Sequence, residues 1–200
     1  MALHCPATLV LARHGQAAYD DPDVLSDAGG WLTPTGRDQV RALAEGLRPE
    51  RVAAVRTSPM ARAAESGALA AEVLGVGSTV VDGLEEVHVG DTAGRPEGDP
   101  AFQDVFDAWL GGDLDRRVPG AESGHEVVAR VREALLGIAD EFRGEQVLVV
   151  THGGVMAFAV PRLCDNLRDD HVLGHGFVPN AVPLRLTVGD DGWTAGAWPA

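Results

Sequence analysis

The sequence predicts an α/β fold in which a central, mostly parallel sheet is flanked by helices as a three-layer sandwich. Two short apolar runs, residues 8–12 and 146–151, are rich in branched side chains and have the length of buried strands. Strand-like runs also alternate with amphipathic helical segments, as they do in α/β folds. Both apolar runs end in His-Gly, at His14 and at His152. Because ligands of open α/β sheets bind beyond the carboxyl ends of the strands, these histidines mark a candidate site.

The composition excludes several classes of function. The chain has 200 residues, of which 45% are hydrophobic and 23% charged, as expected of one globular domain with a sizeable core. Its formal net charge of -14 argues against a nucleic-acid partner and against binding to an anionic membrane. We see neither a signal peptide nor the roughly 20 apolar residues that span a bilayer, so we expect a cytoplasmic protein. Since all 16 basic residues are arginines, no Walker A loop or Schiff base can form.

Capping signals predict the helices of the first half. Thr33, followed by proline, begins a helix after an acidic loop. A second strand spans residues 52–55, and Ser58 is the expected N-cap of a helix over residues 59–74. That helix carries Arg62 in its first turn. Because a helix amino terminus offers unpaired N–H groups and a positive dipole end, an arginine there would complete an anion site.

The second half predicts an excursion from the sheet over about residues 88–121. Aromatic residues at helical spacing predict a short helix over 101–110, which either packs on the core or forms a lid over a substrate. Ser123 and Glu126 have capping-box spacing and begin a long amphipathic helix. We also expect a short strand at 79–81, a helix at 153–163 and a polar segment at 165–176. A hairpin with an Asp-Gly turn is expected at 182–198. We expect one domain over residues 1–200, whose last hairpin could offer an edge to a homodimer.

Four residues form a candidate anion site. Arg13 and Arg62 can each bind a dianion through paired N–H donors. One histidine at a strand end is most often structural, but His14 and His152 together with these arginines favour a functional site. On the residues alone, His14 could be a base, a nucleophile or a donor to phosphate. Nearby arginines disfavour protonation of an imidazole, which would keep His14 neutral and nucleophilic.

Five ordered motifs resemble those of the histidine phosphatase superfamily, in its phosphoglycerate mutase-like branch. Each motif alone is weak evidence, but the set is specific and spans nearly the whole chain. The motifs are Leu11-Ala-Arg13-His14-Gly15, Thr57-Ser58-Pro59-Met60-Ala-Arg62-Ala63, Leu84-Glu-Glu86-Val-His-Val-Gly90, Glu122-Ser123 and Val150-Thr151-His152-Gly153-Gly154.

The resemblance implies a phosphoryl-transfer reaction on a small phosphorylated metabolite. His14 would attack phosphorus in line and become a phosphohistidine. Arg13, Arg62 and His152 would hold the transferred group and neutralise its growing charge. No metal and no other cofactor is implied, because the positive side chains take the place of a cation.

One of two adjacent carboxylates would act as the acid. Glu86 would protonate the departing oxygen and then deprotonate the water that hydrolyses the intermediate. We prefer it to Glu85 because it matches the family's acid, three residues ahead of a hydrophobic-Gly pair. Strand alternation would also send the two side chains to opposite sides. Glu85 remains the alternative.

The loop after His14 departs from the family's pattern. The family often has Glu-Thr and an Asn there, whereas residues 16–20 read Gln-Ala-Ala-Tyr-Asp. Asp20 falls where the Asn would help bind phosphate, and a carboxylate so placed would repel the substrate unless it points elsewhere. Other candidates for substrate binding are Gly15, Gln16, Ser58, His88 and Gly153.

Three functions remain open. A phosphatase for small phosphomonoesters is favoured because the stretch from Gly90 to Glu122, which holds most of the excursion, is short and would shield a phosphohistidine poorly from water. A phosphoglycerate mutase-type isomerase is the first alternative. A non-catalytic phospholigand-binding protein is the second, and it would lack a nucleophile or an acid, whereas both His14 and Glu86 are present.

Other histidines and cysteines carry weaker signals. His171 and His175 have the spacing of one helical face and could share a metal, but no third ligand is apparent, which favours solvated surface. Cys5 and Cys164 lack CxxC spacing, and we expect both to be buried or inert. His4 belongs to no cluster.

Overall fold

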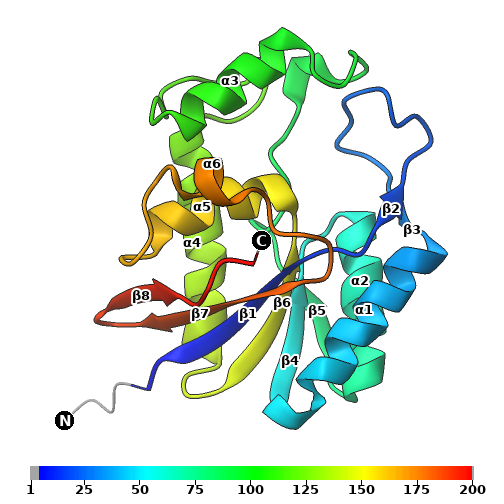
Figure 1. Cartoon of the computed structure of the whole chain (residues 1–200), viewed down its shortest axis with the longest axis vertical. Coiled ribbons are helices and arrows are strands. Elements are labelled where there is room, and N and C mark those ends of the chain that lie inside the picture. Colours follow the sequence, from blue (N-terminus) through cyan, green and yellow to red (C-terminus); the bar gives the residue numbers. More distant parts are fainter. Residues whose placement is uncertain (1–4, 200) are drawn as a thin grey trace.

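The computed structural model describes residues 5–199, and a six-stranded sheet forms its middle layer (Figure 1). The strands are β1 (Ala7–Arg13), β4 (Val52–Thr57), β5 (Ser78–Val80), β6 (Gln146–Thr151), β7 (Pro183–Gly189) and β8 (Gly192–Ala195). Their order in the sheet is β5-β4-β6-β1-β7-β8. The first four run parallel, whereas β7 and β8 pair antiparallel. The predicted fold, a mostly parallel sheet between helical layers, is therefore confirmed.

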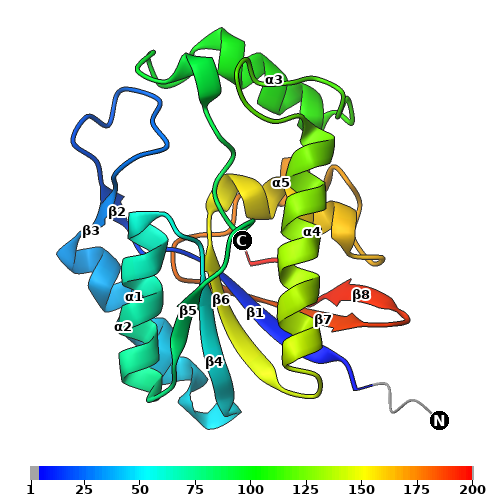
Figure 2. The same cartoon turned by 180° about the vertical axis from the view of Figure 1, so that it is seen from behind.

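Helices cover both faces of this sheet (Figure 2). α1 (Pro34–Leu47) and α2 (Ala61–Leu74) cover one face, and α4 (Gly124–Glu141) and α5 (Gly153–Leu163) cover the other. The remaining α-helices of the described residues are α3 (Pro100–Leu110), which lies beyond the carboxyl edge of the sheet (Figure 1), and the short α6 (His171–His175). In β1, Leu9 and Leu11 belong to the core beneath α4 and α5, while Val10 and Ala12 belong to the core beneath α1 and α2. Because the strand is buried on both faces, its sequence is continuously apolar and does not alternate.

Two of the three predicted helix caps form. The Thr33 side chain accepts a hydrogen bond from the first turn of α1, and Ser123 and Glu126 make both bonds of a capping box on α4. The predicted cap of α2 is wrong, because the N-cap is Met60 and Ser58 lies two residues before it. The hydroxyl of Ser58 is instead directed into the candidate site described below.

Several short elements lie where the sequence predicts loop or polar surface. They are the paired strands β2 (Ala17–Ala18) and β3 (Trp31–Leu32), the 3₁₀ turns η1 (Arg48–Glu50) and η2 (Gly90–Thr92), and α6. Elements of two to five residues are too short to show a hydrophobic period. The closing hairpin forms as predicted, although its second strand ends at Ala195.

Two loops stand together beyond the carboxyl edge of the sheet (Figure 1). One is the excursion over residues 88–121, which carries α3, and the other is the acidic loop after β2. The backbone N–H of Leu25 donates to the carbonyl of Arg95 at 2.8 Å, and that of Glu97 donates to Asp23 at 2.8 Å. These bonds join the two loops into one arch above the strand ends.

The short helix α3 packs through its aromatic side chains. Trp109 is fully buried, and its ring centroid lies 5.2 Å from that of Phe158 in α5. Phe106 is also buried and stacks on Phe102 and Phe177, at 6.5 Å and 6.3 Å between ring centroids. These contacts support the prediction that α3 packs on the core over the alternative that it forms a free lid.

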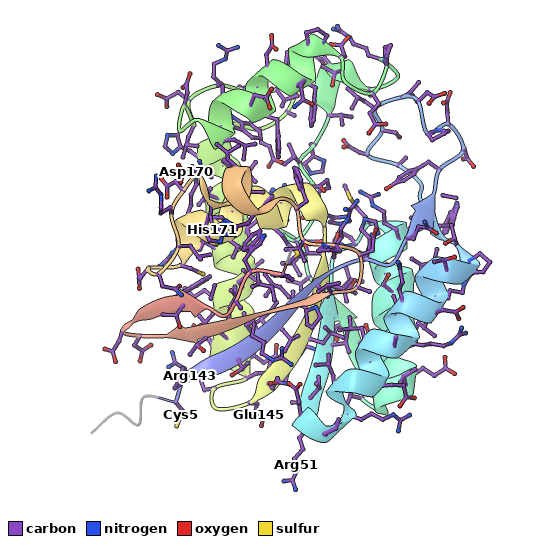
Figure 3. The ribbon with its side chains drawn as sticks, viewed as in Figure 1. Cys5, Arg51, Arg143, Glu145, Asp170 and His171 are labelled. Atoms are coloured by element: carbon purple, nitrogen blue, oxygen red, sulfur yellow. The ribbon has the colours of Figure 1, made fainter. Side chains whose placement is uncertain are left out.

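The two cysteines differ. Cys164 is buried, and burial raises the pKa of its thiol to about 12. Cys5 is exposed, so of the two expected alternatives, buried or inert, burial does not hold for this thiol. It lies near Glu145, where β1 and β6 begin, at the end of the sheet away from the two His-Gly turns (Figure 3). His4 lies outside the described residues. Within residues 5–199, no helix has the length and apolar character needed to cross a membrane.

Candidate active site

The carboxyl ends of three neighbouring parallel strands position the site. The N–H of His14 donates to the carbonyl of Thr151 at 3.0 Å, and the N–H of Ser58 donates to that of Val150 at 3.0 Å. These bonds continue the ladders of β1, β6 and β4 by one residue. His14, Ser58 and His152 therefore leave the sheet side by side, at the edge where α/β proteins bind their ligands.

The two histidines meet at this edge. Their ring centroids lie 5.3 Å apart with the planes tilted by 59°. His14 is 4% exposed and His152 is 0% exposed. Although 137 residues separate them in the chain, the structure thus brings the two His-Gly turns into one site, as the strand-end pattern predicts.

His14 is held neutral, with one ring nitrogen free. Its Nδ1 lies 2.7 Å from the carbonyl oxygen of Gly15, which can only accept, so Nδ1 carries the proton and Nε2 a lone pair. Burial is the main cause that lowers the pKa of His14 to about 3; the Gly15 hydrogen bond opposes it, and the charges of Arg62 and Arg13 lower it further. From the sequence we expect the arginines to keep His14 neutral, whereas in the structure burial lowers the pKa of His14 more than their charges do. An unprotonated Nε2 can act as a nucleophile.

His152 is prepared as a hydrogen-bond donor. Its Nε2 lies 2.8 Å from the hydroxyl of Ser58, which also accepts from the N–H of Met60 at 3.3 Å. When that hydroxyl donates its own proton to Nε2, the ring proton of His152 lies on Nδ1. Burial, followed by the charge of Arg62, lowers the pKa of His152 well below its ordinary value. The neutral ring therefore offers one N–H.

Unpaired donors identify the kind of ligand that the site fits. Among the described residues, the buried side-chain nitrogens without a hydrogen-bond partner include Nε of Arg13, Nε of Arg62 and Nδ1 of His152. Arg62 is 4% exposed, and its other nitrogens make only long contacts, with the carbonyl of Gly29 at 3.4 Å and the sulfur of Met60 at 3.3 Å. Buried donors without acceptors are costly, so an oxyanion is the ligand that would satisfy them.

Glu86 lies next to this donor cluster. Its carboxylate accepts hydrogen bonds from the N–H groups of Gly154 at 2.9 Å and Val155 at 2.7 Å. Both belong to the first turn of α5, whose N-cap is His152. One helix end therefore fixes the carboxylate beside the second histidine, within the positive field of the helix terminus.

Glu85 has different surroundings. Its Oε2 accepts from the N–H of Gly83 at 2.7 Å and lies 3.8 Å from Arg130. The segment that carries both glutamates is not a strand, so the expected strand alternation is wrong as a reason for separating them. The contacts nevertheless place only Glu86 against α5, which supports the preference for Glu86 as the acid.

Two glycines allow close contacts in the site. A Cβ on Gly153 would lie 3.1 Å from Nε of Arg13, and a Cβ on Gly154 would lie 2.7 Å from Oε1 of Glu86. Gly15 contributes its backbone, since its N–H donates to the hydroxyl of Ser66 at 3.1 Å. These glycines support the shape of the site through backbone contacts.

In the described part of the chain, three candidates for substrate binding have no bond to the site: two of them have other partners, and the third is exposed. Oε1 of Gln16 accepts from the hydroxyl of Thr33 at 2.8 Å, and Nδ1 of His88 lies 3.3 Å from a carboxylate oxygen of Asp27. Asp20 is exposed in the acidic loop. Within residues 5–199, no hydrogen bond joins any of the three to the histidines or arginines of the site.

Two supporting residues were not predicted. The hydroxyl of Ser66 donates to the carbonyl of Arg62 at 2.7 Å, and the amide of Asn180 donates to the carbonyl of His14 at 2.7 Å. Ser66 lies one turn after Arg62 on α2, so helical spacing could have identified it. Asn180 comes from an irregular segment before β7 and carries no such signal.

The histidine pair outside the site is a packing feature. His171 and His175 of α6 stack with ring centroids 4.0 Å apart, and Trp198 packs edge-on against His171 at 5.3 Å. Within residues 5–199, no group of three or more histidine, cysteine, aspartate or glutamate side chains could hold a metal ion.

Gly154→Ala is expected to slow turnover without loss of stability. The new methyl would displace the Glu86 carboxylate, whereas alanine is favoured over glycine in a helix by up to about 1 kcal/mol. Steady-state rates and thermal melts would test this. Gly137→Ala in α4 is the matched control, because its Cβ meets nothing within 4 Å. Equal rates for Gly154→Ala and wild type would contradict the expectation.

The fold and the site define an α/β protein whose strand ends carry unpaired donors that suit a phosphate-like anion. The sequence model of the histidine phosphatase superfamily (branch 1) matches residues 9–199. The chain belongs to the histidine phosphatase superfamily, as its motifs predict, and is a phosphatase or mutase of that family.

Three similar proteins carry phosphatase or mutase names. A metal-independent phosphoserine phosphatase of Arabidopsis thaliana is 30% identical over 196 residues, which cover 95% of this chain and 80% of that protein. Phosphoglycerate mutase-like protein 4 of the same plant is 29% identical over 199 residues, 96% and 84% of the two chains. Among solved structures, a mycobacterial glucosyl-3-phosphoglycerate phosphatase superposes with a TM-score of 0.78 at 25% identity, covering 96% of this chain and 98% of its own.

Proposed function

We propose that this protein is a metal-independent phosphatase that hydrolyses small phosphomonoesters through a phosphohistidine at His14. The observation that carries the proposal is the free Nε2 of a neutral His14 beside the unpaired donors of Arg13, Arg62 and His152. A nucleophile next to an oxyanion site is what phosphoryl transfer requires. The relatives named as phosphatases add support.

The reaction follows in two steps. Nε2 of His14 forms a bond to phosphorus as the ester oxygen leaves on the opposite side, and that oxygen takes a proton from Glu86. In the second step, Glu86 takes a proton from water, whose oxygen attacks phosphorus, and Nε2 leaves with its electron pair. Arg13, Arg62 and His152 donate hydrogen bonds to the phosphoryl oxygens in both transition states.

A mutase is the second candidate, favoured by the relative with a phosphoglycerate mutase-like name. In a mutase, the phosphohistidine would return its phosphoryl group to another hydroxyl of the substrate and water would be excluded. Product analysis separates the two, because hydrolysis releases orthophosphate and a mutase yields positional isomers.

A substrate screen tests the proposed function. Purified protein would be assayed for orthophosphate release from phosphoserine, sugar phosphates, phosphoglycerates, glucosyl-3-phosphoglycerate and phosphorylated precursors of the cobalamin nucleotide loop, each with and without EDTA. We expect release from at least one compound at a rate that EDTA does not change. Loss of activity that a divalent cation restores would contradict the metal-independent mechanism. Binding of phosphate esters without turnover would favour a phospholigand-binding protein.

The buried histidines are expected to make stability depend on pH. The pKa of His14 is lowered from 6.5 to about 3, so between these values the unfolded chain binds a proton that the folded chain does not. The free energy of unfolding should therefore fall as pH falls below 6.5, by at most about 1.4 kcal/mol per pH unit for each such proton. Urea unfolding at pH 7.5 and pH 5 would measure the loss. A His14→Ala variant should lose less free energy of unfolding between these two pH values. A loss equal to that of the wild type would contradict the assignment of the effect to His14.

A further inference from the structure

The acid lies on a segment with no regular structure. Residues 81–89 connect β5 to η2 without a helix or strand. Two bonds join them to the sheet, from the N–H of Val81 to the carbonyl of Thr57 at 2.9 Å and from the hydroxyl of Thr151 to the carbonyl of Leu84 at 2.7 Å. A general acid must be held to within a fraction of an ångström, because a displacement of about 1 Å can slow a reaction by about 100-fold. Beyond Leu84, contacts from outside the sheet must therefore fix this backbone.

Arg130 of α4 makes these contacts. Its Nη1 donates to the carbonyls of Gly83 at 3.0 Å and Glu85 at 2.9 Å, and its Nη2 donates to that of Glu86 at 3.1 Å. One guanidinium thus binds three carbonyls within four consecutive residues. The side chain is 19% exposed, so water competes weakly for these bonds.

Glu122 fixes the guanidinium in turn. Its two carboxylate oxygens accept from Nε and Nη2 of Arg130, both at 2.7 Å, in the bidentate geometry that makes such pairs strong. The same carboxylate accepts from the N–H of His88 at 3.3 Å, on the far side of Glu86. The pair therefore binds the segment at both ends, and Glu122 itself ends the excursion.

We infer that Arg130, oriented by Glu122, is a positioning residue for the acid Glu86, an inference that rests on the proposed function. The pair holds the backbone of the segment from α4, while α5 holds the Glu86 carboxylate through the N–H groups of Gly154 and Val155. The guanidinium of Arg130 binds this backbone and Glu122, and Glu122 binds Arg130 and the N–H of His88. Their loss should therefore act on the two proton transfers of Glu86, and kcat/KM, which reports the steps up to the phosphohistidine, isolates the transfer to the leaving oxygen.

The test compares two substrates in Arg130→Met. An alkyl phosphate needs protonation of its leaving oxygen, whereas an activated aryl phosphate such as p-nitrophenyl phosphate does not. We expect kcat/KM for the alkyl ester to fall about 10- to 100-fold and kcat/KM for the aryl ester to stay within about threefold. Arg132→Met, at an exposed position on the same helix, is the matched control and should leave both rates unchanged. Arg130→Lys should recover part of the lost alkyl rate.

The aryl rate also reports whether the variants fold. Glu122→Gln keeps the side-chain shape and serves as a second variant, with the same selective loss expected. Equal slowing of both esters in Arg130→Met and Glu122→Gln, or no slowing, would overturn the inference while leaving the proposed function intact. If wild-type protein hydrolyses neither ester nor any compound of the screen, the proposed function fails and this inference fails with it.

Discussion

His14→Ala is expected to reduce turnover by roughly 10⁴-fold or more, because the variant has no atom that can bond to phosphorus. The fold should survive, since the backbone bonds of His14 to Thr151 and Asn180 do not involve the imidazole. Removal of a buried imidazole should also leave the arginine pair able to bind phosphate. Orthophosphate release under saturating substrate measures the effect.

Two controls make this result specific. His125→Ala removes an exposed histidine of α4 whose nearest charged partner is Asp115 at 3.4 Å, and it should turn over as wild type does. A rapid quench of wild-type protein with ³²P-labelled substrate, under the alkaline conditions that preserve a P–N bond, should trap labelled protein, and His14→Ala should trap none. A His14→Ala variant that keeps the wild-type rate would exclude the phosphohistidine mechanism.

The residues at strand ends were predictable because local and global signals agree there. An apolar run that stops at His-Gly defines both a strand and its carboxyl end, and parallel strands bring such ends to one edge. For His14 and His152, the sequence therefore predicts position and proximity together. Arg62 was predictable for a related reason, since a helix that follows a strand begins at the same edge.

The surroundings of the acid were not predictable in the same way. Glu86 lies on irregular backbone, so no period indicates where its carboxylate points. In the sequence, Arg130 is one more polar position of an amphipathic helix. Only the folded chain shows that its guanidinium donates to the carbonyl of Glu86. The arch between the acidic loop and the excursion is equally hidden, because its hydrogen bonds join backbone groups about 70 residues apart.

Ser58 shows how a local rule can fail at a functional site. Its position before Pro59 fits a helix cap, yet its hydroxyl lies 2.8 Å from His152, and Met60 caps the helix without a side-chain bond. The chain thus gives up a cap that is typically worth about 1 kcal/mol, and the same hydroxyl sets the tautomer of a buried histidine.

Glu86→Gln is expected to slow alkyl phosphates by about 100- to 10,000-fold, the usual contribution of a general acid, and activated aryl phosphates far less. The amide can keep one hydrogen bond from the first turn of α5, through its oxygen, but it has no proton to give to an alkoxide. Parallel measurements of kcat/KM on an alkyl and an aryl ester give the ratio that isolates this role, because kcat/KM excludes the hydrolysis of the phosphohistidine that both esters share.

Glu85→Gln is the matched control, since it makes the same change one residue earlier. Its carboxylate faces Gly83 and Arg130, not α5, so both esters should react at nearly the wild-type rate. A selective loss with alkyl esters in Glu85→Gln, and none in Glu86→Gln, would transfer the acid role to Glu85. An equal loss of kcat/KM for both esters in Glu86→Gln would mean that the carboxylate organises the start of α5 and does not protonate the leaving oxygen.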